Sequence, residues 1–393
     1  MQTIHVSSAQ QSPKSTVLIM GDQINRGIAS LADKTPDDTR ILFIELATKF
    51  SDKQWHKQKV HLLLSALKHF AQELREEGFE VDYRIAKNLS EGVKAHKKDF
   101  NVSHVIAMEP MNWNGKKILE NLDIELVRNN QFLCHYEDFA EWTTTKTKFK
   151  MEDFYRWQRK RLDILMDGST PCEGKWNFDH DNRERPPRDG REWPPITLFE
   201  HDDIDNDILQ NLNDFWGAYP KGVWPVTREQ ALIRLDEFVN GALKPFGPYE
   251  DAMLGKEWKL AHSVLSSSLN IGLLHPMEVV RAVEQAYIDG EAPINSVEGF
   301  IRQVIGWREY VWGLYWLWMP EYRSENFLEA NRNIPLAFRE QGSTEMSCIR
   351  GAMDHLHEYA YTHHIERLML FGNLSLTTGT VSYTHLTLPT NPE

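Results

Sequence analysis

Two adjacent histidines, His363 and His364, are the first candidates for chemistry; they stand in the segment EYAYTHHIERLMLFGN. Imidazole titrates near neutral pH, which makes histidine a common general acid or base. Adjacent residues of a helix point to different sides. The pair indicates a proton donor or, as for most such pairs, packing and surface residues, and this segment alone does not decide between them.

A cluster of hydroxyl residues forms the second candidate. His262 and Ser263 open the stretch HSVLSSSLNIGLLHP, and Ser266, Ser267 and Ser268 follow at the expected start of a helix. Hydroxyls and free backbone N–H groups at a helix N-terminus point the same way, and the helix dipole favours an anion there. The stretch predicts either a pyrophosphate site or an ordinary capped helix, and the local sequence favours the capped helix.

The third candidate is an aromatic helix, residues 294–319, with the sequence INSVEGFIRQVIGWREYVWGLYWLWM. Arg302, Arg308 and Glu309 form a charged patch among its tryptophans and tyrosines. Aromatic side chains bury large areas and dominate core energetics. Taken alone, the sequence of this helix is equally consistent with core packing and with a role in a functional site.

The first third of the chain alternates short apolar strands with helices. The first expected strand lies in the stretch 15–25 and ends at residues 21–23, where a loop opens. The other expected strands are 40–47, 81–86, 104–109 and 124–127, and the expected helices are 53–77, 89–100 and 114–121. This alternation predicts an open parallel α/β sheet, whose ligands bind at the carboxyl ends of the strands. Asp22, Gln23 and Glu45 lie at such ends, where Asp22 and Gln23 either bind a ligand or cap the next element.

The remainder of the chain has a helical pattern. Helices are expected at 228–243, 260–274, 276–289, 297–318 and 346–374. We expect an α/β domain at residues 15–140, an interdomain connector rich in Pro, Gly and charge at 141–204, and an all-α domain at 205–379. A tail, 380–393, has no helical periodicity.

Composition limits the function classes. The chain has 393 residues, 41% of them hydrophobic, and a formal net charge of -13, which speaks against a general nucleic-acid binder but allows a local basic groove. The N-terminal residues show no pattern of a charged region followed by an apolar one, so we expect no secretory signal, and no apolar run reaches membrane-spanning length. Three cysteines without a C-x-x-C pair favour a reducing cytosol. The absence of G-x-G-x-x-G and P-loop motifs argues against a dinucleotide or nucleoside triphosphate site.

Several motifs, in the right order from residue 17 to 379, together resemble the cryptochrome/photolyase superfamily. They are GDQ at 21–23, GKWNFDxxNR at 174–183, HSxLSxxxNxGLL at 262–274, EGFIRQVIGWREY at 298–310, MxC at 346–348 and AYxHHIxRLM at 360–369. More narrowly, they resemble the bacterial iron–sulfur branch, the prokaryotic (6-4) photolyases.

This resemblance implies an α/β antenna-type domain followed by an all-α domain that binds FAD. It implies light-dependent repair of UV-damaged DNA, in which reduced FAD gives an electron to a (6-4) pyrimidine photoproduct flipped out of the duplex. The alternatives are a cryptochrome-like blue-light photoreceptor without repair and an inactive fragment. We expect a cytoplasmic monomer that binds UV-damaged DNA and no membrane.

The resemblance also implies residue roles. His364 would donate a proton to the lesion, with His363 beside it. Gln303, Trp307 and Arg308 would face the flavin and the lesion. The residues expected at the FAD phosphates and ribityl chain are His262, Ser263, Leu265, Ser266 and Tyr249.

The chain departs from this family in three respects. A [4Fe–4S] cluster takes four Cys ligands, but only Cys348 matches a family position, so we expect no cluster in this chain alone. The tail fits nothing in the family, so we expect the helical domain to be incomplete at its C-terminus. Of the positions that match the lumazine antenna site, only His56 fits, which leaves Asp22, Gln23, Glu45 and His56 as weak antenna candidates.

Overall fold

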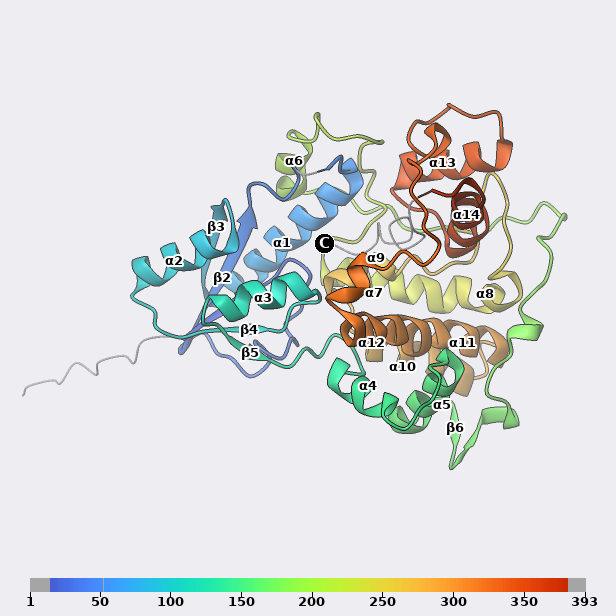
Figure 1. Ribbon diagram of the computed structural model, residues 1–393, viewed down its shortest axis with the longest axis horizontal. Helices are drawn as coiled ribbons and strands as arrows, with labels where there is room; N and C mark the ends of the chain where they lie inside the picture. Colours follow the sequence, from blue (N-terminus) through green and yellow to red (C-terminus); the bar gives the residue numbers. More distant parts are fainter. Residues whose placement is uncertain (1–14, 52, 381–393) are drawn as a thin grey trace, which may run out of the picture. The chain divides into compact units, whose positions relative to one another are not determined.

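The computed structural model describes residues 15–51 and 53–380 (Figure 1). Its contacts divide the chain into two compact units. We call residues 15–20, 26–49 and 70–129 the sheet unit, and residues 21–25, 50–69 and 130–380 the helical unit. The domain boundaries expected from the sequence stay predictions.

The sheet unit contains five parallel strands in the order β3-β2-β1-β4-β5. The strands are β1 (Ser15–Ile19), β2 (Thr39–Leu46), β3 (Glu80–Ala86), β4 (Val105–Met108) and β5 (Glu125–Val127). Its helices are α2 (Leu89–Phe100) and α3 (Trp113–Asn121), and α1 (Lys57–Glu76) is shared between the two units.

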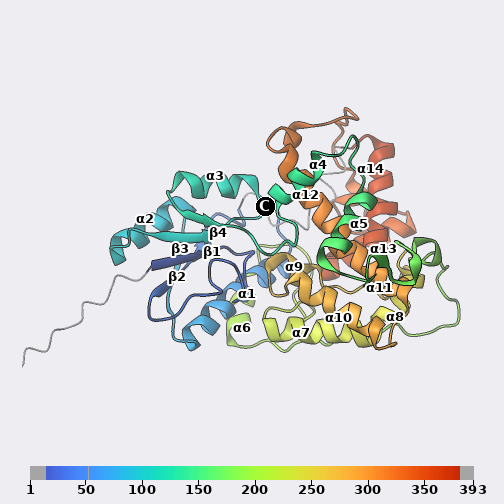
Figure 2. The same cartoon turned by 90° about the horizontal axis from the view of Figure 1, so that it is seen from below.

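One face of this sheet is closed by α2 and α3, which lie on the same side in Figure 2. Leu18 and Leu42 of the strands pack there against Val93 of α2 and Leu119 of α3, and each is almost fully buried. The strands of a parallel sheet that helices cover are buried, so their sequences are nearly continuous apolar runs. The prediction of an open parallel α/β sheet is therefore confirmed, strand by strand.

The helical unit contains the other long elements. Its helices are α4 (Tyr136–Thr143), α5 (Met151–Leu162), α6 (Asp203–Leu209), α7 (Arg228–Glu237), α8 (Leu243–Tyr249), α9 (Ser266–Ile271), α10 (Pro276–Ile288), α11 (Ile294–Ile301), α12 (Glu309–Trp318), α13 (Ser347–Tyr359) and α14 (Asn373–Thr378). Three π-helical segments, η3 (Phe238–Ala242), η4 (Arg302–Arg308) and η7 (Glu366–Gly372), directly precede α8, α12 and α14.

Short elements complete the helical unit. They are the hairpin β6 (Met166–Asp167) and β7 (Thr170–Pro171), and the 3-10 turns η1 (Cys172–Gly174), η2 (Asp179–Asp181), η5 (Glu321–Ser324) and η6 (Leu336–Phe338). Among the described residues, no helix combines the length and the apolar character needed to cross a membrane.

Two helices expected from the sequence are wrong in extent. The expected helix 260–274 shrinks to α9, because Leu260 and Val264 adopt left-handed backbone angles (φ 45° and 51°) that a right-handed helix excludes. The expected helix 346–374 breaks after α13, where Ala360 (φ 54°) closes the helix with a hydrogen bond from its N–H to the carbonyl of Leu356. The tail 381–393 lies outside the described residues.

An aromatic cluster joins α12 to α4 and α5. The Phe139 ring makes edge contacts with Phe154, at 5.2 Å between centroids, and with Tyr310, at 5.8 Å. The backbone of Gly313 in α12 lies so close to Phe139 that an added Cβ would be 2.2 Å from its ring. The φ angle of Gly313 is ordinary for a helix and would allow any residue. Glycine is therefore required here by the close contact with Phe139 and not by the backbone conformation.

We predict that Gly313→Ala destabilises the protein. Alanine gains about 1 kcal/mol of helix propensity over glycine, but such overpacking costs about 1–3 kcal/mol, and a 2.2 Å contact belongs at the upper end. Thermal unfolding of the purified chain should show a lower Tm. Gly255→Ala, where no atom lies within 4 Å of the new Cβ, is the matched control. Equal Tm values for the two variants would contradict this packing.

Candidate functional site

The aromatic helix is one helical run in which α11, η4 and α12 follow without interruption (Figure 1). Its middle, Arg302–Arg308, is π-helical. Such segments are rare and frequently occur at functional sites, because the i→i+5 bonds insert an extra residue and redirect side chains. The three residues expected on this helix, Gln303, Trp307 and Arg308, all fall within it.

Gln303 and Trp307 form the accessible part of η4. Trp307 is 45% exposed, whereas Tyr310, Trp312 and Trp316 of the same helix are buried. Gln303 is half-buried, and its amide makes a long contact of 3.4 Å with the carbonyl of Gly299. Since residues four apart lie on one helical face, an aromatic surface and an amide face outward together.

Arg308 points into the protein. Its guanidinium lies 3.9 Å over the ring of Phe132, 3.3 Å from the carbonyl oxygen of Gln131 and 3.4 Å from Glu309 Oε1. Burial lowers the pKa of Arg308 and raises that of Glu309 to about 7. In this arrangement Arg308 joins the aromatic helix to the segment before α4, and its expected contact with a cofactor stays a prediction.

Arg302 is the centre of an ion network. Its guanidinium lies 3.2 Å from Glu298 Oε1, 3.4 Å from Asp179 Oδ1 and 3.7 Å from Glu250 Oε1. The second carboxylate oxygen of Glu250 is buried without a hydrogen-bond partner. Burial raises the pKa of Glu250 to about 7, and the opposing effect of Arg302 is smaller.

The two histidines differ sharply in environment. His363 is fully buried, and its ring stacks on that of His262 with centroids 4.6 Å apart. Burial lowers the pKa of His363 to about 2. His364 is exposed and starts the helical turn that leads into η7. Partial desolvation and Arg367 lower its pKa, and Asp251 opposes them.

The loop before α9 holds the other expected cofactor residues. His262 Nδ1 lies 2.9 Å from the carbonyl of Lys259, and burial lowers the pKa of His262 to about 4. Ser263 Oγ accepts a hydrogen bond from the N–H of Leu265 at 3.4 Å. The side chain of Leu265 is fully buried, so this residue offers a ligand only backbone groups.

A pocket opens at the start of α9. Its cavity volume is about 90 Å³, and it is lined by Ser266, Ser267, Asn270 and Tyr361 among others. Ser266 is exposed, and the buried hydroxyl of Ser267 has no hydrogen-bond partner in the described structure. Tyr249 lies at the end of α8, where its ring contacts Trp193 at 5.5 Å.

The antenna candidates are divided between the two units. Glu45 belongs to the sheet unit and accepts a hydrogen bond from Tyr83 at 2.5 Å. Asp22, Gln23 and His56 belong to the helical unit and are buried. His56 Nε2 lies 2.8 Å from the carbonyl of His357, which ties the start of α1 to α13. Their role as antenna residues stays a prediction.

The three cysteines lie in different segments of the helical unit. Cys348 is exposed on α13, Cys134 is buried before α4, and Cys172 is half-buried in η1. All three are free thiols. The structure therefore brings no second cysteine of this chain into a set with Cys348.

Sequence reasoning missed the acidic part of this site. Asp179, Glu250 and Asp251 surround Arg302, and Asp251 interacts electrostatically with His364. Asp179 belongs to the motif GKWNFDxxNR, and Glu250 directly follows Tyr249. Membership of this motif was the available signal for Asp179. Asp179 lies 71 positions before Glu250, and Glu250 and Asp251 lie 52 and 51 positions before Arg302, so spacing does not reveal these contacts.

Comparison with known proteins gives concordant matches. A family model described as deoxyribodipyrimidine photo-lyase-related protein matches residues 17–219. The chain is 37% identical over 379 residues to the (6-4) photolyase of Agrobacterium fabrum strain C58, a match that covers 92% of this chain and 74% of that protein. It is 27% identical over 172 residues to an uncharacterized protein of Acanthamoeba polyphaga mimivirus, covering 39% of this chain and 86% of that protein.

Solved structures agree on the fold. A bacterial class III photolyase from Agrobacterium tumefaciens matches with a TM-score of 0.59 at 15% identity, over 95% of this chain and 74% of that one. A cryptochrome from Synechocystis sp. matches with a TM-score of 0.59 at 13% identity, over 94% of this chain and 76% of that one. An α/β unit followed by a helical unit is therefore confirmed as the fold class.

Glu250→Gln tests the electrostatics of the site. The pKa of Glu250 in the folded protein is about 7, above the ordinary value of 4.5 in the unfolded chain. Between pH 4.5 and pH 7 the folded protein therefore binds more protons than the unfolded chain, and its free energy of unfolding falls as the pH rises. Glutamine at position 250 does not titrate, so the variant does not undergo this fall in stability. The stability of the variant relative to the native chain should rise by up to about 3 kcal/mol from about pH 5 to about pH 8.

Chemical denaturation at the two pH values measures the difference. Glu229→Gln, at an exposed position of α7, is the matched control and should not reproduce the pH-dependent gain. A difference between variant and native chain that stays constant with pH would show that Glu250 is ionised in the folded protein throughout.

Proposed function

The chain belongs to the deoxyribodipyrimidine photo-lyase-related protein family, and from this premise we propose that it repairs UV-damaged DNA of the (6-4) class in a light-dependent, FAD-requiring reaction. Membership confirms the resemblance read from the motifs. The observation that carries the finer proposal is the accessible imidazole of His364, which interacts with Asp251 of the carboxylate group around Arg302.

FAD fits the residues at the start of α9. The unpartnered hydroxyl of Ser267 and the exposed hydroxyl of Ser266 line the pocket at the start of α9. His262, Ser263 and Leu265 directly precede them, and the hydroxyls and backbone N–H groups there would hold the phosphates and the ribityl chain. When bound, reduced FAD supplies the electron for repair after it absorbs light.

Three residues would act on the lesion. Trp307 offers an exposed aromatic surface on which a flipped base can stack, and Gln303 offers an amide for orientation. His364 would hold a proton on its imidazole and pass it to the lesion as a general acid. Asp251 favours the protonated form of His364.

His363 would serve a different purpose. Its buried, neutral ring stacks on His262, and neither of its nitrogens has a hydrogen-bond partner in the described structure. This supports a packing role that sets the position of its neighbour. The proposal therefore assigns the proton to His364 and the support of the cofactor loop to His363.

Two groups known in the family do not enter the proposal. A [4Fe–4S] cluster needs four cysteine ligands, and this chain has three cysteines, of which Cys348 alone matches. The residues therefore do not fit the cluster. A lumazine-type antenna is not supported either, because the Nε2 atom of His56 already contacts the carbonyl of His357. The monomeric state and the cytoplasmic location stay predictions.

We predict that His364→Asn abolishes repair without loss of flavin. The purified chain, loaded with FAD and reduced, is given a duplex with one (6-4) lesion under blue light, and restored bases are counted. Loss of a general acid lowers the rate by about 10²–10⁴-fold. His104→Asn, at an exposed histidine of the sheet unit, should keep the native rate.

The outcomes separate the alternatives. A native chain that binds flavin and responds to light yet leaves the lesion untouched would support a photoreceptor and overturn repair. A native chain without flavin absorbance would overturn the assignment of the α9 pocket. An unchanged rate in His364→Asn would remove the proposed proton donor.

A further inference from the structure

One cluster of metal-ligating side chains lies outside the proposed site. His69 of α1 faces Asp202 and Asp205 at the start of α6, and one ligand atom from each lies within 4.8 Å of the other two. Among the described residues, this is the single group of three or more such side chains that meets this geometry. All three residues belong to the helical unit.

The orientation of His69 is fixed by its second nitrogen. His69 Nδ1 lies 2.8 Å from the carbonyl oxygen of Ser65, which can only accept, so Nδ1 carries a proton. His69 Nε2 then faces Asp202 Oδ2 at 2.8 Å. Metal-binding histidines in proteins characteristically donate their other N–H to a carbonyl or carboxylate in this way, which presents the ligating nitrogen.

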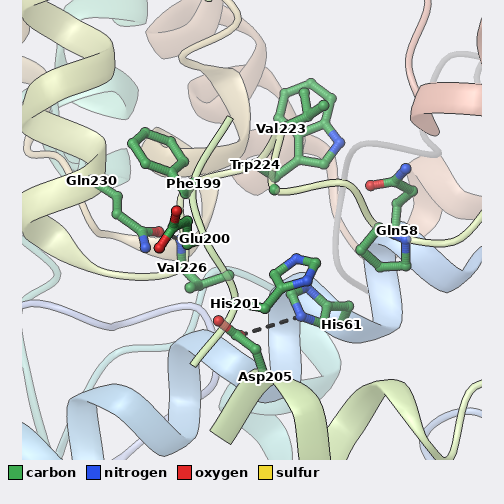
Figure 3. Close-up of a pocket in the computed structure, with 12 residues that line it drawn as sticks. Gln58, His61, Phe199, Glu200, His201, Asp205, Val223, Trp224, Val226 and Gln230 are labelled. Carbon is green, nitrogen blue, oxygen red and sulfur yellow. Dashed lines mark hydrogen bonds and ion pairs between the residues drawn. The ribbon is translucent and has the colours of Figure 1, made fainter. Parts of the chain in front are cut away.

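Buried polar atoms beside this cluster form an ion pair without a hydrogen bond of good geometry. His61 Nε2 and Asp205 Oδ1 lie 3.2 Å apart, but neither atom makes a hydrogen bond of acceptable geometry in the described structure. Both residues are more than nine-tenths buried. Figure 3 shows Asp205 pointing toward His61, with His201 beside it; the two imidazole rings lie 5.1 Å apart. The hydroxyl of Ser65 is also buried and unpartnered.

A buried carboxylate oxygen that makes no hydrogen bond is costly, even where an imidazole lies beside it. An unsatisfied buried polar atom costs about 1–3 kcal/mol, and more when it is charged. Asp205 sits beside Asp202, so the cluster places two carboxylates together, and a cation that satisfies both would remove the cost. His61 and His69 are neutral or monovalent partners, whereas a divalent ion balances both carboxylates at once.

We propose that this cluster binds one divalent transition-metal ion, of which Zn²⁺ is the representative, through His69 Nε2, Asp202 Oδ2 and a carboxylate oxygen of Asp205. Mixed imidazole and carboxylate ligands are typical of Zn²⁺, whereas Mg²⁺ favours an all-oxygen octahedron. His61 lies on the buried side of the cluster. The Asp202 side chain is 55% exposed, which gives the ion access from solvent and leaves a position for water.

The bound ion would join two segments that are far apart in sequence. α1 supplies His69, and the residues before and within α6 supply the two carboxylates, 133 positions later. Without the ion, Asp202 and Asp205 form the capping box of α6. The ion would add a tie between the two helices to this local cap, and this inference does not depend on the proposed repair function.

Zinc binding to the full chain tests the proposal. After treatment with EDTA, the chain is dialysed against Zn²⁺ and the bound metal is measured; one ion per chain and a raised Tm are expected. Asp202→Asn keeps a good N-cap residue but removes a charged ligand, so the helix should persist. His69→Gln removes the nitrogen ligand. Each variant should bind Zn²⁺ more than about tenfold more weakly.

The matched control is Asp203→Asn, which makes the same charge change at the next, exposed position of α6. It should bind Zn²⁺ as the native chain does. The proposal is overturned if the native chain takes up no more Zn²⁺ than Asp202→Asn, or if Asp203→Asn loses as much affinity as Asp202→Asn. Equal displacement of Zn²⁺ by Mg²⁺ would overturn the choice of metal class.

Discussion

The buried guanidinium of Arg302 is the interaction on which the candidate site depends. It is 7% exposed and reaches carboxylates from its own helix, from the connector at Asp179 and from the end of α8 at Glu250. Breaking a buried ion pair by removing one partner typically costs about 3–5 kcal/mol, because the remaining charge is uncompensated. These segments must therefore meet at Arg302, and their meeting places Gln303 and Asp251 near the same centre.

The aromatic helix must satisfy two opposing demands. Its second half packs tightly into the core through Tyr310, Trp312 and the bare backbone of Gly313, whereas Trp307 stays exposed. In a regular α-helix the buried face and the exposed face each continue along the whole helix. The π segment at residues 302–308 changes that phase, so core packing and an outward aromatic surface coexist on one helix.

Local patterns sufficed for the sheet and for most helices. The central strands β1 and β4 are short apolar runs, which burial on both faces requires, and the motifs identified the α9 loop and the histidine pair. The break at Ala360 and the shortening of α9 could not be predicted from local sequence. They follow from left-handed backbone angles at Leu260, Val264 and Ala360, and none of these residues is a glycine or asparagine that would signal such a conformation. The carboxylates around Arg302 and the cluster of His69 with Asp202 depend on contacts across more than 50 positions, where spacing carries no signal.

The histidine pair illustrates how environment separates identical side chains. A proton on His363 would be buried in a ring that stacks on His262, with the two centroids 4.6 Å apart, and neither nitrogen of His363 makes a hydrogen bond. Burial therefore keeps both of these rings neutral. His364, one residue later, is exposed and close enough to Asp251 for the carboxylate to offset a positive charge. Adjacent residues point to different sides of a helix, and here His363 lies in the core whereas His364 is exposed at the start of the helical turn. The degree of burial, rather than the residue type, therefore distinguishes the two positions.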